Sequence, residues 1–370
     1  MAGVVKGSFA NPLIEQRKLA EGQAAVNLGD RGIITVTGPD RLEWLHSLLS
    51  QNLKNLVPGQ SAEALLLDPN GHIEQVIHFL DDGETSWLVV ESEGREALVK
   101  WLTKMVFRMK VEVADRSADF TVIGRLVRGE NAKADLDQAA VSNGVPLTWV
   151  DPWPGVVTGG VRYSRAWPAK WPWTETLVAN ENVDSVFAEF EPAGTLAYDA
   201  LRIAAHRPRQ LGEVDDKALP HEFDWLSTAV HMSKGCYRGQ ETVAKVHNLG
   251  HPPRRLTFLH LDGSDHALPE VGDEIFIADE SNAGPNVAVP EGVAPVSKSA
   301  RGKITSVGQH HEMGPIALAL LFRNVPEDAA LTVRTGLGDL AANQEVIVPQ
   351  SAGKANDIPK IPKLLMGGKH

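Results

Sequence analysis

The chain has 370 residues, of which 43% are hydrophobic and 22% are charged, and its formal net charge at pH 7 is -11. Such a length and composition are typical of a globular protein with two or three domains, and the negative charge argues against broad, non-specific binding of nucleic acid. No apolar run is long enough for a membrane-spanning helix, and a single cysteine cannot form an internal disulfide. Since the N-terminal residues show no secretory signal pattern, we expect a cytoplasmic protein.

The N-terminal third of the chain alternates between strand and helix patterns. Residues 33–37 predict a strand, and leucines at the helical spacing of three and four predict a helix over residues 42–53. Residues 61–92 predict three strands, and residues 95–113 predict a helix that leads into a strand. This order favours an α+β domain whose sheet is covered by helices on one face, and we place it at residues 1–118.

A second α+β domain is predicted at residues 119–250. It begins with a strand pattern at Phe120 and contains a helix pattern between Gly194 and Pro208. Five of the nine tryptophans lie between Trp149 and Trp173, in a segment rich in proline and glycine. We interpret them as an aromatic-packed loop or interface, with a ligand-stacking platform as the alternative.

The remainder of the chain predicts a small C-terminal β-barrel at residues 251–350, because short strand patterns alternate with turns. Residues 280–299 have no periodicity and predict an exposed insertion. Residues 351–370 predict a flexible tail.

The single cysteine, Cys236, lies in a run of glycines and cations from Lys234 to Glu241. A lone cysteine is often a buried packing residue, but the surrounding cations disfavour a dry core and favour the thiolate. A metal site with His247 and His251, or a nucleophile assisted by a histidine, is an alternative with less support in the sequence. Glycine backbone groups and cationic side chains also suit an anionic ligand, and a carboxylate beside an amide suits a pterin ring.

The same run resembles the K-G-C-Y-x-G-Q-E signature of the YgfZ family of folate-binding proteins. That family is related to the aminomethyltransferase, or T-protein, of the glycine cleavage system. A weaker resemblance covers residues 32–53, 198–208 and 302–321. The resemblance implies a T-protein-like multidomain ring that binds tetrahydrofolate, or a one-carbon derivative of it, near a central opening.

The resemblance also implies a role in the assembly or repair of iron–sulfur clusters in client enzymes, including enzymes that modify tRNA, with no direct nucleic-acid or membrane partner. Cys236 would be the reactive residue, and no metal site is expected. The candidate folate-binding residues are Lys234, Gly235, Tyr237, Arg238, Gly239, Gln240, Glu241, Arg202, Tyr198, Glu222, Glu74 and Gln75. For Gln240 and Glu241 the alternative role is to brace the loop, and for Arg202, Tyr198 and Glu222 it is packing or ion pairing.

Two departures from the T-protein pattern bear on enzyme activity. T-proteins carry an acidic pair where this chain has Glu74 and Gln75, and an acid where it has Ala204. An amide cannot act as a general base, so aminomethyl transfer in glycine cleavage is disfavoured. A one-carbon transferase with another acceptor is a second hypothesis. A non-catalytic scaffold that docks a client through Trp167, Trp171 or Trp173 is a third.

Overall fold

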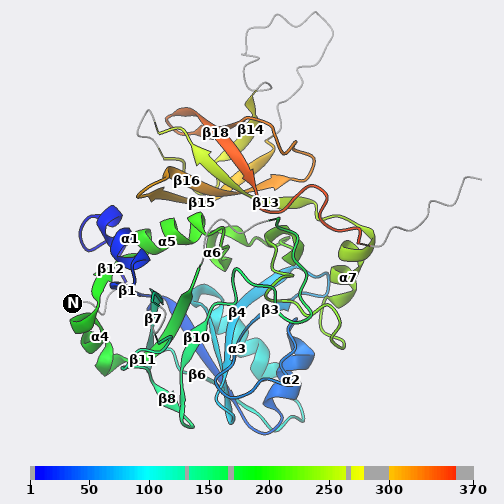
Figure 1. Cartoon of the computed structure of the whole chain (residues 1–370). Coiled ribbons are helices and arrows are strands. Elements are labelled where there is room, and N and C mark those ends of the chain that lie inside the picture. Colours follow the sequence, from blue (N-terminus) through cyan, green and yellow to red (C-terminus); the bar gives the residue numbers. More distant parts are fainter. Residues whose placement is uncertain (1–4, 130–132, 166–170, 264–267, 279–299, 356–370) are drawn as a thin grey trace, which may run out of the picture.

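A computed structural model describes residues 5–129, 133–165, 171–263, 268–278 and 300–355. Within these ranges the chain forms two five-stranded sheets, a closed barrel of six strands and a two-stranded ribbon of β8 (Val141–Ser142) and β9 (Val145–Pro146). The two sheets form the lower body of the molecule, and the barrel lies above them (Figure 1). The predicted α+β class with a C-terminal barrel is therefore confirmed. The predicted insertion at residues 280–299 lies outside the described residues.

The first sheet has the strand order β3-β4-β5-β2-β6, with antiparallel neighbours throughout. Its elements are β2 (Arg31–Thr37), α2 (Arg41–Leu48), β3 (Ser61–Leu67), β4 (Ile73–Asp81), β5 (Thr85–Glu91), α3 (Ser92–Met105) and β6 (Glu112–Asp115). Both helices cover one face, where Leu45, Leu98 and Leu102 pack against the strands. Because side chains alternate along a strand, Leu80 and Val89 face the opposite side, toward the second sheet.

The second sheet has the order β10-β11-β7-β1-β12. Its elements are α1 (Pro12–Ala20), β1 (Ala24–Asn27), β7 (Phe120–Leu126), β10 (Thr148–Val150), β11 (Trp173–Ala179), the 3-10 turn η1 (Asn180–Asn182), α4 (Val183–Glu189), β12 (Glu191–Ala193) and α5 (Thr195–Ala204). Strand β1 pairs in parallel with β12 and antiparallel with β7. Residues 24–27 lie within the predicted N-terminal domain at residues 1–118, but they belong to the second sheet. The physical reason is that β1 and β12 complete each other's backbone hydrogen bonds across a long connection, which no local pattern reveals.

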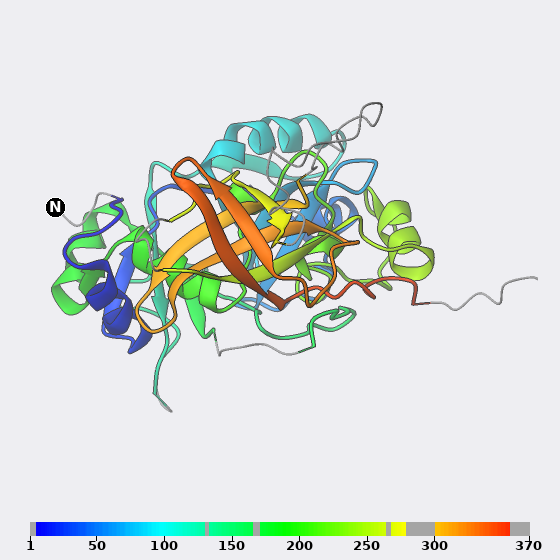
Figure 2. The ribbon, with the colours of Figure 1, turned by 90° about the horizontal axis from the view of Figure 1, so that it is seen from above.

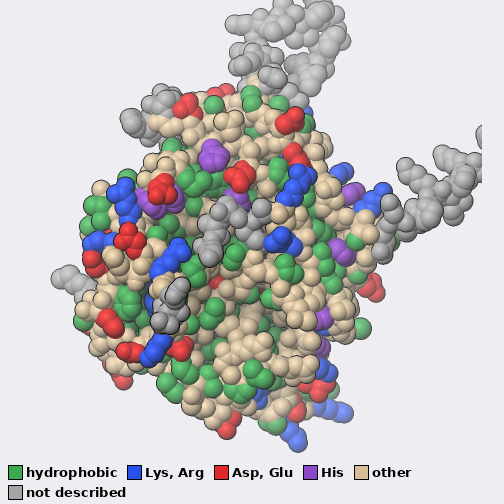
Figure 3. All heavy atoms as spheres, in the orientation of Figure 1, with side chains coloured by type: hydrophobic (Ala, Val, Ile, Leu, Met, Phe, Trp, Pro, Cys, Tyr) green, Lys and Arg blue, Asp and Glu red, His purple; other side chains and the backbone are tan. Residues whose placement is uncertain are grey.

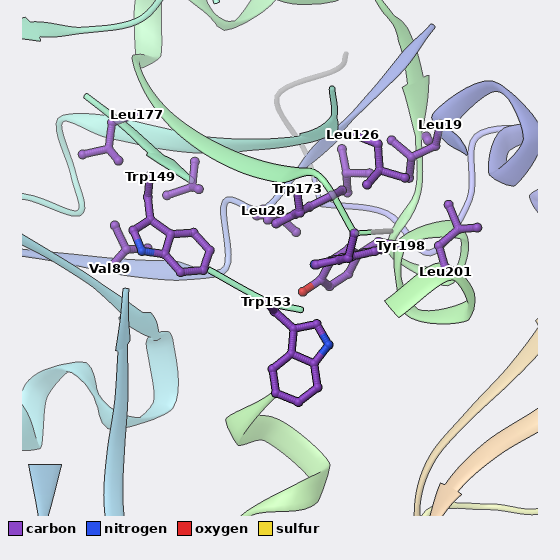
Figure 4. Close-up of a cluster of buried hydrophobic side chains, with 14 of the residues drawn as sticks. Leu19, Leu28, Val89, Leu126, Trp149, Trp153, Trp173, Leu177, Tyr198 and Leu201 are labelled. Carbon is purple, nitrogen blue, oxygen red and sulfur yellow. The ribbon is translucent and has the colours of Figure 1, made fainter. Parts of the chain in front are cut away.

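The two sheets meet in one aromatic core. Trp149, Trp153, Trp171 and Trp173 are all buried there, together with Tyr198 of α5 (Figure 4). The indole Nε1 of Trp149 also donates to the carbonyl oxygen of Ala62 at 2.7 Å, which ties β10 to β3. All four are packed in this core, as the first interpretation predicts, and Trp173 also lines the cavity described below.

The barrel has the closed order β13-β16-β15-β14-β17-β18. Its strands are β13 (Arg254–Leu261), β14 (Glu274–Ile277), β15 (Gly302–His310), β16 (Gly314–Phe322), β17 (Leu331–Thr335) and β18 (Gly338–Val346). It lies over the middle of the two-sheet body when seen from above (Figure 2). Gly308 allows close contact with α5, because a Cβ there would lie 3.0 Å from the Cα of Ala200.

Two short elements and one longer helix connect α5 to the barrel. They are α6 (Gln210–Glu213), the 3-10 turn η2 (Pro220–Phe223) and, after the cysteine run, α7 (Gln240–Leu249). The start of the predicted tail is not free, because Ala352 is buried and its carbonyl oxygen lies 2.7 Å from Nδ1 of His251. Residues 351–355 thus pack beside α7, and residues 356–370 lie outside the described residues.

Candidate functional site

The cysteine run forms an exposed loop that leads into α7, and it is held at the base of the first sheet. Cys236 is exposed. Gly239 has φ 81°, and a Cβ there would lie 2.6 Å from the carbonyl oxygen of Asp68, in the turn between β3 and β4. The two glycines that flank the cysteine therefore differ in their structural role. Gly239 must be glycine because of its positive φ and its close contact, whereas Gly235 has open space around it.

Lys234 anchors this loop to the end of α2. Its Nζ donates to the carbonyl oxygens of His46, Leu49 and Gln51, the last at 3.1 Å. The carbonyls of His46 and Leu49 lie at the C-terminus of α2, where unsatisfied carbonyls favour a cation, and that of Gln51 lies just after the helix. Burial lowers the pKa of Lys234 to about 7. The amino group of Lys234 thus points into the protein, toward these carbonyls. This contact differs from the predicted role of Lys234, which is to favour the Cys236 thiolate.

Arg238 joins the loop to the start of β4 in the first sheet. Its Nη1 lies 2.6 Å from the carboxylate of Glu74, and its guanidinium lies over the ring of Trp101. The backbone carbonyl of Glu74 in turn accepts from Nε2 of Gln210 at 3.2 Å, and Oε1 of Gln210 accepts from the backbone N–H of Val76 at 2.7 Å. This sequence of contacts leads from the cysteine loop to the wall of a cavity.

The rest of the loop is internally braced. Tyr237 is buried in the core beneath the barrel. Nε2 of Gln240 donates to the carbonyl oxygen of Lys234 at 3.4 Å, which corresponds to the bracing alternative, and Glu241 is exposed.

A small cavity, with a water-accessible volume of about 20 Å³, lies where the two sheets meet α5 and α6. It is lined by Arg31, Val76, His78, Val89, Glu91, Asp151, Trp173, Glu175, Tyr198, Arg207, Pro208, Arg209 and Gln210. Of the predicted site residues, only Tyr198 is in this lining, and Figure 4 shows its hydroxyl pointing toward the space beside Trp153. Below, this space is called the central cavity.

One wall of the central cavity is an ion-paired layer built on β11 and β2. Nδ1 of His78 lies 2.7 Å from Glu175, and the imidazole stacks on Trp149 with ring centroids 3.8 Å apart. Arg31 lies 3.6 Å from the same carboxylate. Burial would raise the pKa of Glu175, but His78 and Arg31 lower it to about 2. The carboxylate is therefore ionised and fixed, and the imidazole is oriented by it.

A second ion-paired group closes the opposite side. Arg207 lies 2.9 Å from Asp151 and 2.7 Å from Glu63. Burial raises the pKa of Asp151 to about 6 in spite of the arginine. Nη1 of Arg207 is buried and has no hydrogen-bond partner among the described residues. Arg207 lines the cavity, so this buried donor without an acceptor belongs to its wall.

Two predicted ligand residues, Arg202 and Glu222, have structural partners. Arg202 pairs with Asp199 at 2.7 Å and donates to Ser306 of the barrel. Glu222 is buried and pairs with Arg254 at 2.8 Å.

Gln75 does not line the central cavity. It faces the helix-covered side of the sheet, where a Cβ at Gly94 would lie 2.1 Å from its Nε2. The replacement of a T-protein acid by Gln75 therefore does not determine whether a general base is present in the central cavity.

Sequence reasoning missed the charged lining of the cavity, namely Arg31, His78, Glu175 and Arg209. A weak signal was present, because each charged side chain in β2, β4 or β11 interrupts an apolar strand, and a buried charge requires a partner. Which partners meet depends on the docking of the two sheets, which the sequence pattern does not give.

The metal and nucleophile alternatives find no support in the described part of the chain. Nδ1 of His247 lies 2.8 Å from the hydroxyl of Tyr163, and His251 contacts Ala352. Within the described ranges no three His, Cys, Asp or Glu side chains are grouped as a metal site. No helix in those ranges combines the length and hydropathy that a bilayer span requires.

Comparison with solved structures identifies the class of fold. The glycine cleavage system aminomethyltransferase T from Bartonella henselae superposes with a TM-score of 0.66 at 17% identity, and the match covers 94% of each chain. The fold is therefore that of an aminomethyltransferase, which confirms the predicted T-protein-like architecture. No protein-family model matches the chain.

Comparison with curated proteins identifies the relatives within that class. The putative transferase At1g60990, chloroplastic, of Arabidopsis thaliana is 25% identical over 70% of this chain and 61% of its own length. The tRNA-modifying protein YgfZ of Klebsiella pneumoniae is 26% identical over 68% of this chain and 75% of its own. The mitochondrial iron–sulfur cluster assembly factor IBA57 homolog of Mycosarcoma maydis is 27% identical over 61% of this chain and 54% of its own. The predicted relationship to YgfZ and to aminomethyltransferase-like proteins is confirmed, although the chain spans only part of the length of the plant and fungal relatives.

Proposed function

We propose that this protein binds tetrahydrofolate, or a one-carbon derivative of it, at the central cavity, which must widen to admit the ligand, and supports iron–sulfur enzymes through Cys236. The clients would include enzymes that modify tRNA. The observation that carries the proposal is the central cavity, because aromatic side chains and oriented ionic groups from both sheets converge there.

The cavity chemistry suits a pterin ring with an acidic tail. Trp173 and Tyr198 supply aromatic surface for a planar ring, and the ionised carboxylate of Glu175 supplies an acceptor for ring N–H groups. The unpartnered Nη1 of Arg207 supplies a donor for a ring or tail oxygen. The names of the IBA57 and YgfZ relatives support a role with iron–sulfur proteins and tRNA modification.

Cys236 is proposed as the group that acts on a client rather than on the bound folate. It is exposed on a loop that Lys234 and Arg238 hold in place, and it is absent from the lining of the central cavity. An exposed thiol on a fixed loop is accessible to a partner protein.

A one-carbon transferase is the second candidate, and His78 is the observation that favours it. Its imidazole lines the cavity and is oriented by Glu175 at 2.7 Å, an arrangement that can move a proton. The scaffold hypothesis loses two of its three anchors, because Trp171 and Trp173 are 3% and 1% exposed. Trp167 lies outside the described residues.

The test is a calorimetric titration of tetrahydrofolate into the wild type and three variants. Tyr198→Phe removes the hydroxyl at the cavity and keeps the ring, so we expect about fivefold weaker binding for one lost hydrogen bond. Tyr163→Phe is the matched control, since that hydroxyl contacts His247 instead. Cys236→Ala should bind folate as the wild type does, yet fail to restore iron–sulfur enzyme activity in cells that lack the protein. Absence of binding by the wild type would refute the proposal.

A further inference from the structure

A second, chemically different pocket lies beside the base of the cysteine loop. It is open to solvent and has a water-accessible volume of about 280 Å³. Its polar lining consists mainly of Gln51, Asn52, Asn55, Gln60, Thr228 and His231. We call it the amide pocket. Its wall meets that of the central cavity at one buried carboxylate, because Glu63 accepts from Thr228 at 2.6 Å and from Arg207 at 2.7 Å.

The lining of the amide pocket carries no Asp, Glu, Lys or Arg among its described residues. A charged ligand would lose its hydration there without gaining an ion pair, so the pocket selects an uncharged one. The central cavity has the opposite character, since most of its polar lining is ionic. The two spaces therefore suit different ligands.

Two polar atoms at the amide pocket are buried without a hydrogen-bond partner among the described residues. They are Oδ1 of Asn52 and Nδ1 of His231. Both atoms have almost no accessible surface, so they lie behind the wall, and the groups that a ligand meets are the other polar atoms of the lining. The surrounding carboxamides each offer both a donor and an acceptor.

The apolar lining gives the shape of the ligand. Leu56, Ala62 and Val157 form the rest of the wall, so a ligand meets apolar surface as well as amides. A planar heterocycle has two apolar faces and a polar edge, and Asn or Gln side chains pair well with the edge of a nucleobase. We propose that the amide pocket binds an uncharged nucleobase or nucleoside.

The pocket also shares its supports with the cysteine loop. The backbone N–H of His231 donates to Ser50 at 3.0 Å, and Nζ of Lys234 donates to the carbonyl of Gln51 at 3.1 Å. A base in this pocket would thus lie against the segment that holds the loop of Cys236. This position is appropriate for a client whose substrate is a nucleic-acid base.

The experiment is a titration of adenosine and guanosine into the whole protein, followed by calorimetry or by the chemical shifts of the histidine ring protons. Binding of at least one nucleoside is expected, and Asn52→Ala should weaken it about fivefold to tenfold through the loss of one hydrogen bond. The side chain of Asn52 makes no described hydrogen bond at Oδ1, so the variant should fold normally. Asn343→Ala, on an exposed position of β18, is the matched control.

Comparator ligands sharpen the result. Adenosine monophosphate should bind no more tightly than adenosine, because no cation lines the pocket to pair with its phosphate. Failure of both nucleosides to bind, equal binding to Asn52→Ala, or equally tight binding of ribose alone would overturn the inference. Displacement of adenosine by tetrahydrofolate would also overturn it, since the two ligands would then share one site. Unchanged folate binding by Asn52→Ala separates this inference from the proposed function.

Discussion

The buried carboxylate of Glu91 gives the wall of the central cavity a measurable dependence on pH. It lies 2.6 Å from Arg31 and 2.7 Å from Arg209, and its side chain is 5% exposed. Burial alone would raise its pKa, but the two arginines lower it from 4.5 to about 2.

The size of the effect follows from the difference between the two pKa values. A decrease of about 2.5 units at about 1.4 kcal/mol per unit corresponds to roughly 3 kcal/mol. Because the pKa is lower in the folded state, this stability is fully present above pH 4.5 and is lost as the pH falls toward 2. Glu91→Gln leaves two arginines short of a partner, so at pH 7 it should lower the free energy of unfolding by about 3–5 kcal/mol.

The assay is urea unfolding followed by tryptophan fluorescence at a series of pH values from 7 down to the lowest at which the wild type folds. The difference between wild type and Glu91→Gln should shrink as the pH falls below 4.5, because the wild type then protonates the carboxyl group that the variant lacks. Glu345→Gln, on the barrel and half exposed, is the control and should show no such convergence. Parallel pH profiles for the wild type and Glu91→Gln would refute the reasoning.

Three further predictions concern the cysteine loop. Lys234→Met should lower the free energy of unfolding by about 2–4 kcal/mol in thermal or urea melts, because three carbonyl oxygens lose their donor. Lys217→Met, at an exposed position, is the control. Equal stability of the two variants would contradict the role of Lys234 in anchoring the loop. Gly239→Ala should cost at least about 1–3 kcal/mol, since φ is 81° and a Cβ meets a carbonyl oxygen, whereas Gly235→Ala, with nothing within 4 Å, should change stability by less than about 0.5 kcal/mol. Cys236 should react completely with iodoacetamide in the native protein, as measured by mass spectrometry, and a requirement for denaturant would disprove its exposure.

The elements that the sequence predicted well are those whose pattern is local. The helix predicted over residues 42–53 is present as α2, but it ends at Leu48. Leu45, Leu49 and Leu53 are all fully buried, although Leu49 is extended and Leu53 follows the helix. The three strands between residues 61 and 92 are present as β3, β4 and β5 because the turns between them are marked by Asp, Asn and Gly.

The pairing of β1 with β12 could not be predicted in the same way. Ala24 pairs with Glu191 and Val26 with Ala193, across most of the N-terminal half of the chain. Both strands are too short to show a clear alternation, and the partner of a short strand is set by the tertiary fold. The domain boundary therefore could not be drawn from composition and turns alone.

The candidate site shows the same division between local and tertiary information. The run around Cys236 was found because its residues are contiguous, but the direction of each side chain was not predictable. Lys234 and Arg238 both appear in sequence as neighbours of the thiol, yet one reaches the end of α2 and the other pairs with Glu74. Side chains at nearby positions in a loop point in different directions. Closeness in sequence therefore did not show that either cation lies beside the thiol of Cys236.

A series of contacts connects the cysteine loop, which lies outside the central cavity, to the wall of that cavity. Arg238 pairs with the side chain of Glu74, and Gln210 binds the backbone of Glu74 on one side and that of Val76 on the other. Gln210 itself lines the cavity. A ligand that moves Gln210 must therefore disturb the strand end that holds Arg238, so occupancy of the cavity and the position of the cysteine loop are expected to be coupled through one strand end.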